Sequence, residues 1–166
     1  NGSYSFNPGT DFDDLAVNES RSVSFDYYAT DVFGDNSGVQ TVTIEVTGAN
    51  DVPVISVVGT DSASEDLTET DAALSVSGTL SVEDLDVSDT VSTSVDSVVA
   101  TGDAGSLVNA DFMAMLSVDA VDVIDSSSTT GTINWDFDSN TEAFDHLANG
   151  EELTLEYSVL ATDSQG

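Results

Sequence analysis

Side chains with the character of calcium ligands stand at three widely separated places in the sequence. Asn50 and Asp51 precede a proline. Asp84 and Asp86 follow one run of alternating apolar residues, and Asp163 ends another. Ca²⁺ takes about six to eight oxygen ligands from carboxylates, amide carbonyls and water. These residues can form a calcium site if the fold gathers them. The alternative is that Asp and Asn occur there because they favour turns and linkers.

The composition excludes some classes of binding partner. The chain has 32 acidic residues against a single base, Arg21, and a formal net charge of −31. Nucleic acids and anionic membrane surfaces are excluded as natural partners, because binding phosphates requires clustered Lys and Arg. A high-salt environment or simple solubility would also account for the acidity.

Other chemistries lack the residues they need. There is no cysteine, so disulfides and thiolate metal sites are excluded, and the single histidine, His146, makes a transition-metal site unexpected. No motif places a serine and an acid beside His146, so we predict no catalytic residues and no enzyme activity. No run of about 20 apolar residues is present, and we expect no membrane insertion.

Alternation of apolar and polar residues predicts the elements that must position the acids. Residues 41–47 place Val42, Ile44 and Val46 on one face, which is typical of a half-buried strand. We predict an all-β fold of immunoglobulin-like or cadherin-like antiparallel β-sandwich modules. The further expected strands are 23–29, 54–58, 74–82, 91–99, 116–124, 132–137 and 153–161, with a short helical turn around 109–115.

An internal repeat indicates that the modules are arranged in tandem. Residues 12–31 align without a gap to residues 144–163, at an offset of 132 positions. A repeat of this length is a whole domain, not a unit of a solenoid. The identical pairs include Phe12/Phe144, Leu15/Leu147, Ala16/Ala148 and Glu19/Glu151, together with the closing Ala-Thr-Asp.

The domain boundary is expected just after Gly48, where a strong strand ends shortly before a proline. Residues 1–48 would be the last three strands (E, F and G) of one repeat, and 49–53 a linker. Residues 54–166 would be strands A to F of the next repeat, which lacks its last strand.

The repeat offset places that missing G strand at about positions 171–179. Neighbouring repeats of the same protein, or other copies of the chain in an assembly, would supply it. In an alternative arrangement, the strand at 39–47 folds back to complete the sheet of residues 53–166, because an incomplete sandwich leaves an open edge.

Three motifs resemble the VCBS-type, cadherin-like tandem repeats of large bacterial surface adhesins, including those with RTX tails. Gly48 to Pro53 (GANDVP) is similar to the family's GxNDxP junction, and Gly78 to Asp86 (GTLSVEDLD) to its GxLxxxDxD segment. Leu147 to Tyr157 (LANGEELTLEY) resembles its LaxGExlxxxf segment, although Asn18 stands at the glycine position of the first copy. The resemblance implies stacked extracellular domains at the cell surface, calcium-stiffened junctions and a role in adhesion, without catalysis.

Sandwich topology predicts that the candidate ligands converge at one end of the second module. The linker, the B–C loop and the F–G loop all lie at this end, and the E–F loop of the preceding module points towards it. We therefore predict an interdomain Ca²⁺ site formed by Asn50, Asp51, Asp84, Asp86, Asp163 and Glu19.

Some other acidic residues are weaker candidates. Asp13, Asp14 and Asp89 could join the same junction. The run from Asp136 to Asn140 begins like a calcium loop, but it lacks the sixth-position glycine and the terminal glutamate, so a strand face followed by a turn is favoured.

The function that these features favour is structural. We expect an extender or stalk repeat of an extracellular bacterial adhesin or filament, held rigid by Ca²⁺ at its junctions and supporting cell adhesion or biofilm formation. The alternative is a glycan-binding or protein-binding module of a surface protein, and an enzyme fragment from a salt-adapted organism comes third. A glycan or cell-surface target would lie elsewhere in the parent protein.

Overall fold

The computed structural model describes residues 3–119 and 121–165. Over these residues the protein consists of antiparallel strands with almost no helix, which confirms the all-β prediction. Within the same ranges no helix has the length and apolar character needed to cross a membrane. The elements are β1 (Ser20–Tyr27), β2 (Gln40–Thr47), β3 (Val54–Ser56), β4 (Ser75–Glu83), β5 (Val91–Gly102), α1 (Asn109–Met113), β6 (Leu116–Val118), β7 (Thr130–Asp138) and β8 (Leu153–Asp163).

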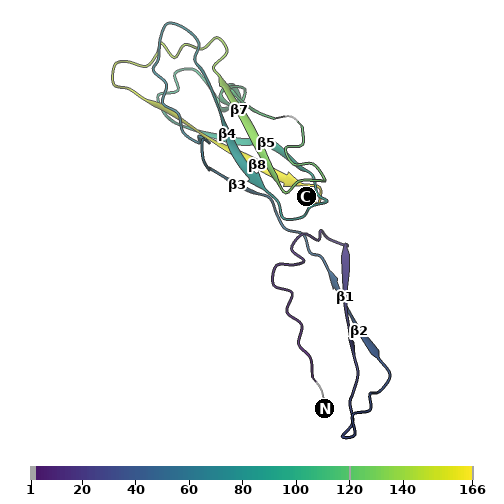
Figure 1. Ribbon diagram of the computed structural model, residues 1–166. Coiled ribbons are helices and arrows are strands. Elements are labelled where there is room, and N and C mark those ends of the chain that lie inside the picture. The colour runs from purple at the N-terminus through teal and green to yellow at the C-terminus, as the bar shows by residue number, and fades with distance from the viewer. Residues whose placement is uncertain (1–2, 120, 166) are drawn as a thin grey trace.

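The described strands form three sheets. β1 pairs with β2, β5 pairs with β8, and the other four strands form one sheet in the order β3-β4-β7-β6. Every pairing is antiparallel. In Figure 1 the β1–β2 hairpin lies at one end of an elongated molecule, and β3, β4, β5, β7 and β8 lie together at the other end. The segment from β2 to β3 joins the two parts.

Side chains of the four-stranded sheet, of the β5–β8 pair and of nearby loops form two clusters of buried residues. One cluster of buried residues comes from β4, β5, β7 and a loop, and a second comes from β5, α1 and neighbouring loops. Removing this apolar surface from water is the main term that stabilises the fold. The first cluster is Leu80, Val82, Val91, Ile124, Ile133 and Trp135, and the second is Val98, Phe112, Met115 and Phe144.

The β1–β2 hairpin buries much less. Every residue of β1 is exposed, including Val23, Phe25 and Tyr27 on its apolar face. Among the described residues of this part of the chain, buried side chains occur only near the linker, at Leu15 and Ala16 in the turn before β1. An isolated two-stranded hairpin is marginally stable in water, so this part of the chain is weakly supported.

The two copies of the sequence repeat share local conformation as well as sequence. In each copy the glutamate carboxylate accepts the backbone N–H three residues earlier, at 3.2 Å for Glu19 and 2.8 Å for Glu151. Asn18 and Gly150 occupy equivalent positions and have φ angles of 69° and 88°. Asparagine therefore adopts the left-handed conformation that glycine takes in the second copy.

No strand forms among the described residues where strand E of the first repeat was expected. Residues 3–7 form no strand, so residues 3–48 contribute β1 and β2 to the described structure. The sequence counterpart of residues 3–7 lies in β7, which is held between β4 and β6. Residues 3–7 lie beside β1, where the Tyr4 ring packs edge-on against Phe25 with the ring centroids 5.4 Å apart, but in the described part of the chain their backbone pairs with no strand.

The strand expected at 116–124 is also shorter, because β6 ends at Val118. The carboxylate of Asp119 accepts both the backbone and the side-chain N–H of Asn134, each at 2.9 Å. The Asp119 side chain thus accepts the Asn134 N–H of β7, which a longer β6 would have bonded through its backbone. The short helical turn predicted at 109–115 forms as α1, whose Phe112 is buried.

Candidate metal site

Three aspartates lie buried in the loop between β4 and β5. Asp84, Asp86 and Asp89 are 1%, 0% and 2% exposed. The Asp86 backbone N–H donates to Asp84 Oδ1 at 3.0 Å, and the Asp89 N–H donates to the Asp86 carbonyl oxygen at 3.1 Å. Aspartate favours such turns because its side chain bonds the backbone two residues on. The turn holds three carboxylates inside the protein.

Strand pairing brings Asp163 to the same place. β8 and β5 pair in a register that sets Asp163, at the end of β8, opposite Val91 at the start of β5. The end of β8 therefore meets the loop that leads into β5. Asp163 is 8% exposed, and its Oδ1 accepts the Gln165 backbone N–H at 2.8 Å.

The linker is attached to this group by two hydrogen bonds. Asn50 Nδ2 donates to Asp163 Oδ2 at 2.9 Å, and the Asp51 backbone N–H donates to Asp86 Oδ2 at 2.8 Å. In Figure 1 the C-terminal end of the chain accordingly lies beside the segment that joins the two parts. Five of the six residues predicted from the sequence are thus brought together.

Three carboxylate oxygens of this group have no hydrogen-bond partner among the described residues: Asp84 Oδ2, Asp86 Oδ1 and Asp89 Oδ2. Buried polar atoms in proteins nearly always have a partner, and a buried group left without one costs about 1–3 kcal/mol, more if it is charged. Such exceptions point to a bound ion, a water molecule or a strained functional site.

The electrostatics of the group are unfavourable. Burial raises the pKa of Asp84 and of Asp86 above the ordinary value of 3.8, because leaving water disfavours the charged form. The negative charges of Asp89 and Asp163 raise both pKa values further, and Asp51 adds to the effect on Asp86. The backbone hydrogen bonds that the two carboxylates accept act in the opposite direction. A cation placed among these groups would relieve their mutual repulsion.

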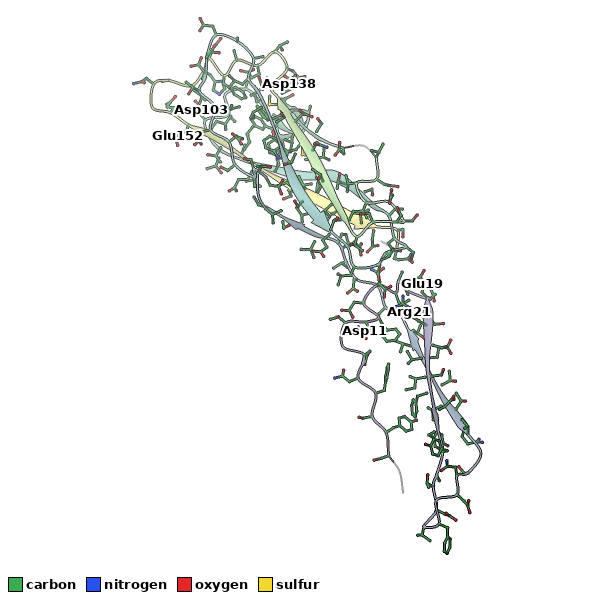
Figure 2. All side chains as sticks on the ribbon, viewed as in Figure 1. Asp11, Glu19, Arg21, Asp103, Asp138 and Glu152 are labelled. Atoms are coloured by element: carbon green, nitrogen blue, oxygen red, sulfur yellow. The ribbon has the colours of Figure 1, made fainter. Side chains whose placement is uncertain are left out.

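The single arginine of the chain is engaged elsewhere. Arg21 forms an ion pair with Asp14, with Nη2 and Oδ2 2.6 Å apart, and its guanidinium lies 5.6 Å from the centre of the Phe12 ring. Figure 2 shows Arg21 near Glu19 and Asp11, where β1 begins. Asp14, a weaker candidate ligand, is therefore neutralised by Arg21, and the ion pair holds the pKa of Asp14 below its usual range.

Glu19, the sixth predicted ligand, has a different role in this structure. Its carboxylate closes a turn by accepting the Ala16 N–H, and its backbone carbonyl accepts the Gly48 N–H at 2.9 Å. Gly48 must be glycine here, because a Cβ atom would collide with the backbone carbonyls of Leu15 and Ala16. The hydrogen bond to the Glu19 carbonyl therefore holds the end of β2 next to the turn that precedes β1.

A second acidic group was not predicted. Among the described residues, the group of three carboxylates whose oxygens all lie within 4.8 Å of one another is Glu69, Asp71 and Asp145. Glu69 is half-buried and the other two are exposed. These residues come from two loops far apart in the sequence, and no motif marks them. The buried aspartates are spaced more widely than this.

His146 is accounted for by local contacts. Its Nε2 lies 3.0 Å from the Asp103 carbonyl oxygen, and its Nδ1 lies 3.9 Å from Glu142 Oε1.

Asn140 ends the run that begins like a calcium loop. It has a φ angle of 60° and donates its backbone N–H to Asp138 Oδ1 at 2.7 Å. Residues 136–140 therefore form the end of β7 followed by a turn.

No protein-family model matches the chain, and neither the curated proteins nor the solved structures searched contain a match to it.

Proposed function

We propose that this protein is a structural repeat of an extracellular bacterial adhesin or filament, in which Ca²⁺ stiffens the junction between successive β-sandwich modules. The role is mechanical, not catalytic: the module extends a stalk and transmits force. Two observations support the proposal. The GANDVP, GTLSVEDLD and LANGEELTLEY segments resemble those of VCBS-type repeats, and acidic residues are arranged around the linker.

The observation that carries the proposal is a set of three buried carboxylate oxygens near the linker that have no hydrogen-bond partner among the described residues. Asp84, Asp86 and Asp89 each keep one oxygen without a partner, and Asn50 and Asp51 bring the linker onto the same group. Acids that served only solubility would lie in water, where their charge costs little.

The chemistry of these donors suits a hard cation. Ca²⁺ takes carboxylate and carbonyl oxygens at about 2.3–2.6 Å. Asp84, Asp86, Asp89 and Asp163 would supply carboxylates, with Asp51 or the amide oxygen of Asn50 completing the set. Binding would require the aspartates to move closer together than they are in this structure. A bound ion would convert their repulsion into attraction and fix the linker to the β4–β5 loop.

The strand order supports the sandwich architecture. The four-stranded sheet β3-β4-β7-β6 corresponds to the order A-B-E-D of a constant-type immunoglobulin domain, and β5-β8 corresponds to C-F of the facing sheet. In that topology the B–C and F–G loops lie at the same end, where Asp84, Asp86 and Asp163 are found. The β1–β2 hairpin corresponds to strands F and G of a preceding module.

Calorimetric titration of the chain with Ca²⁺ tests the proposal. We expect a binding isotherm with Kd on the order of 10⁻⁴–10⁻³ M, as in other extracellular modules. The isotherm should be lost in Asp84→Asn and kept in Asp122→Asn, which removes the same charge from an exposed position. Small-angle scattering should show a more extended, less variable particle in Ca²⁺ than in chelator. A particle of the same dimensions in both would refute junction stiffening.

A further inference from the structure

The turn before β8 contains an asparagine followed directly by a glycine, Asn149 and Gly150, and both residues are exposed. The Glu151 N–H donates to the Ala148 carbonyl oxygen at 2.8 Å and closes the turn. Gly150 has a φ angle of 88°, close to that of the third residue of a type II turn. In the described part of the chain, neither the Asn149 side-chain amide nor the Gly150 N–H has a hydrogen-bond partner. Both groups are therefore free to react with each other.

An asparagine followed by glycine can react with its own backbone. The deprotonated Gly150 nitrogen attacks Asn149 Cγ and forms a C–N bond, while the Cγ–Nδ2 bond breaks and Nδ2 takes up the proton and leaves as ammonia. The resulting succinimide ring then adds one water molecule. Ring opening at Cγ gives aspartate, and opening at the backbone carbonyl gives isoaspartate, in which the chain continues through Cβ and Cγ. Water is the only co-reactant, and no atom is oxidised or reduced.

The first copy of the repeat forms the same turn without the reactive pair. Its Glu19 N–H donates to the Ala16 carbonyl oxygen at 3.0 Å, but Val17 and Asn18 stand at the positions of the asparagine and the glycine. Asn18 is followed by a residue with a side chain, which hinders attack by the backbone nitrogen. Gly150 has no Cβ and leaves its nitrogen accessible. The chemistry therefore distinguishes the two copies.

We infer that Asn149 is a site of self-modification, at which the Gly150 nitrogen converts the asparagine to aspartate and isoaspartate. Either product adds a negative charge beside Glu151 and Glu152. Isoaspartate also adds one carbon to the backbone of a turn whose two closing hydrogen bonds join Ala148 and Glu151, both at 2.8 Å. The loop that leads into β8 is thereby loosened as the protein ages. The inference does not depend on calcium binding, since these residues lie outside the aspartate group.

Incubation of the full chain at mildly alkaline pH, followed by peptide mapping, tests the inference. Tandem mass spectrometry assigns each lost amide to one residue and so separates Asn149 from the other Asn-Gly pair, at positions 1 and 2. We expect Asn149 to be converted to two acidic products, only one of which is cut by a protease that cleaves before aspartate. Asn18 should keep its amide. Conversion of Asn149 only after unfolding in urea, or equal conversion of Asn18, would overturn the inference.

Exchanging the residue pairs between the two turns gives matched controls. Gly150→Asn copies the first turn, where Asn18 has a φ angle of 69°, so the turn is kept while a side chain is added beside the attacking nitrogen. A Cβ at Gly150 would meet no heavy atom within 4 Å. Conversion of Asn149 should be lost in this variant, and undiminished conversion would overturn the assignment.

The reverse exchange tests whether the turn permits the reaction. Val17→Asn combined with Asn18→Gly places the reactive pair in the first turn. We expect loss of the new amide at position 17, measured by the same peptide mapping. A chain that keeps this amide would refute the claim that the turn allows the glycine nitrogen to attack.

Amide hydrogen exchange measures the loosening of the turn. Exchange of the Glu151 N–H should become faster in aged protein, because isoaspartate disturbs its hydrogen bond to Ala148. Asn149→Asp adds the charge without lengthening the backbone, so in this variant the exchange should stay as slow as in fresh protein. Unchanged exchange in a chain shown to contain isoaspartate would refute the loosening.

Discussion

Replacing Asp86 by asparagine should change stability in opposite directions depending on calcium. The substitution keeps the size of a side chain that is 0% exposed and leaves an oxygen for the Asp51 N–H, but it removes a charge surrounded by Asp51, Asp89 and Asp163. In chelator the variant should be more stable than the wild type, by about 1–3 kcal/mol, because an unpaired buried charge is no longer desolvated.

The calcium increment should disappear in the same variant. For Kd of about 10⁻⁴–10⁻³ M, 10 mM Ca²⁺ stabilises the wild type by about 1.4–2.7 kcal/mol. At about 2–4 °C per kcal/mol, the wild-type Tm should rise by about 3–11 °C. The Asp86→Asn variant should show little change.

Differential scanning fluorimetry in chelator and in Ca²⁺ measures both effects, with Asp122→Asn as the charge-matched control. A variant that is no more stable than the wild type in chelator would refute the claim of charge repulsion. An undiminished calcium increment would refute the claim that Asp86 is a ligand.

Two further predictions concern pH and packing. Because Asp84 and Asp86 have raised pKa values in the folded state, their contribution to stability is present below 3.8 and lost as pH rises through the folded pKa. Urea midpoints in chelator should therefore increase as pH falls from 7 towards 4, and in Ca²⁺ they should decrease, since protons displace the ion; a decrease in both media would contradict the raised pKa values. Below 3.8 the lowered pKa of groups such as Asp61 acts in the opposite sense. Ile133→Ala should cost about 2–5 kcal/mol in urea unfolding, because Ile133 is 0% exposed in the first core cluster. The exposed Val99→Ala should cost less than about 1 kcal/mol, and equal costs would contradict the assigned core.

The sequence specified the strands well where alternation is unbroken. Val42, Ile44 and Val46 predicted β2, and the runs beginning at Val91 and Leu153 predicted β5 and β8, because a period of two with β-branched residues has few other solutions. The strand predictions were wrong where strand formation depends on pairing with a neighbouring strand. Residues 3–7 pair with no described strand, and the Asp119 carboxylate accepts the Asn134 N–H that a longer β6 would have bonded through its backbone.

The gathering of the candidate ligands could also be anticipated, since loop positions follow from strand order. Asp84, Asp86 and Asp163 meet at one end because β4 leads into β5 there and β8 ends there. The burial of Asp89 could not be read from its spacing alone, because it depends on how the loop turns. The role of Glu19 as a turn acceptor and the approach of Glu69 to Asp145 depend on side-chain direction, which periodicity does not determine.

Crystals of the chain grown in millimolar Ca²⁺ provide the most direct test of the central claim. An anomalous difference map should contain a peak among Asp84, Asp86 and Asp163, next to the linker at Asn50 and Asp51. A map without a peak there, or with its only peak at Glu69, Asp71 and Asp145, would contradict the account.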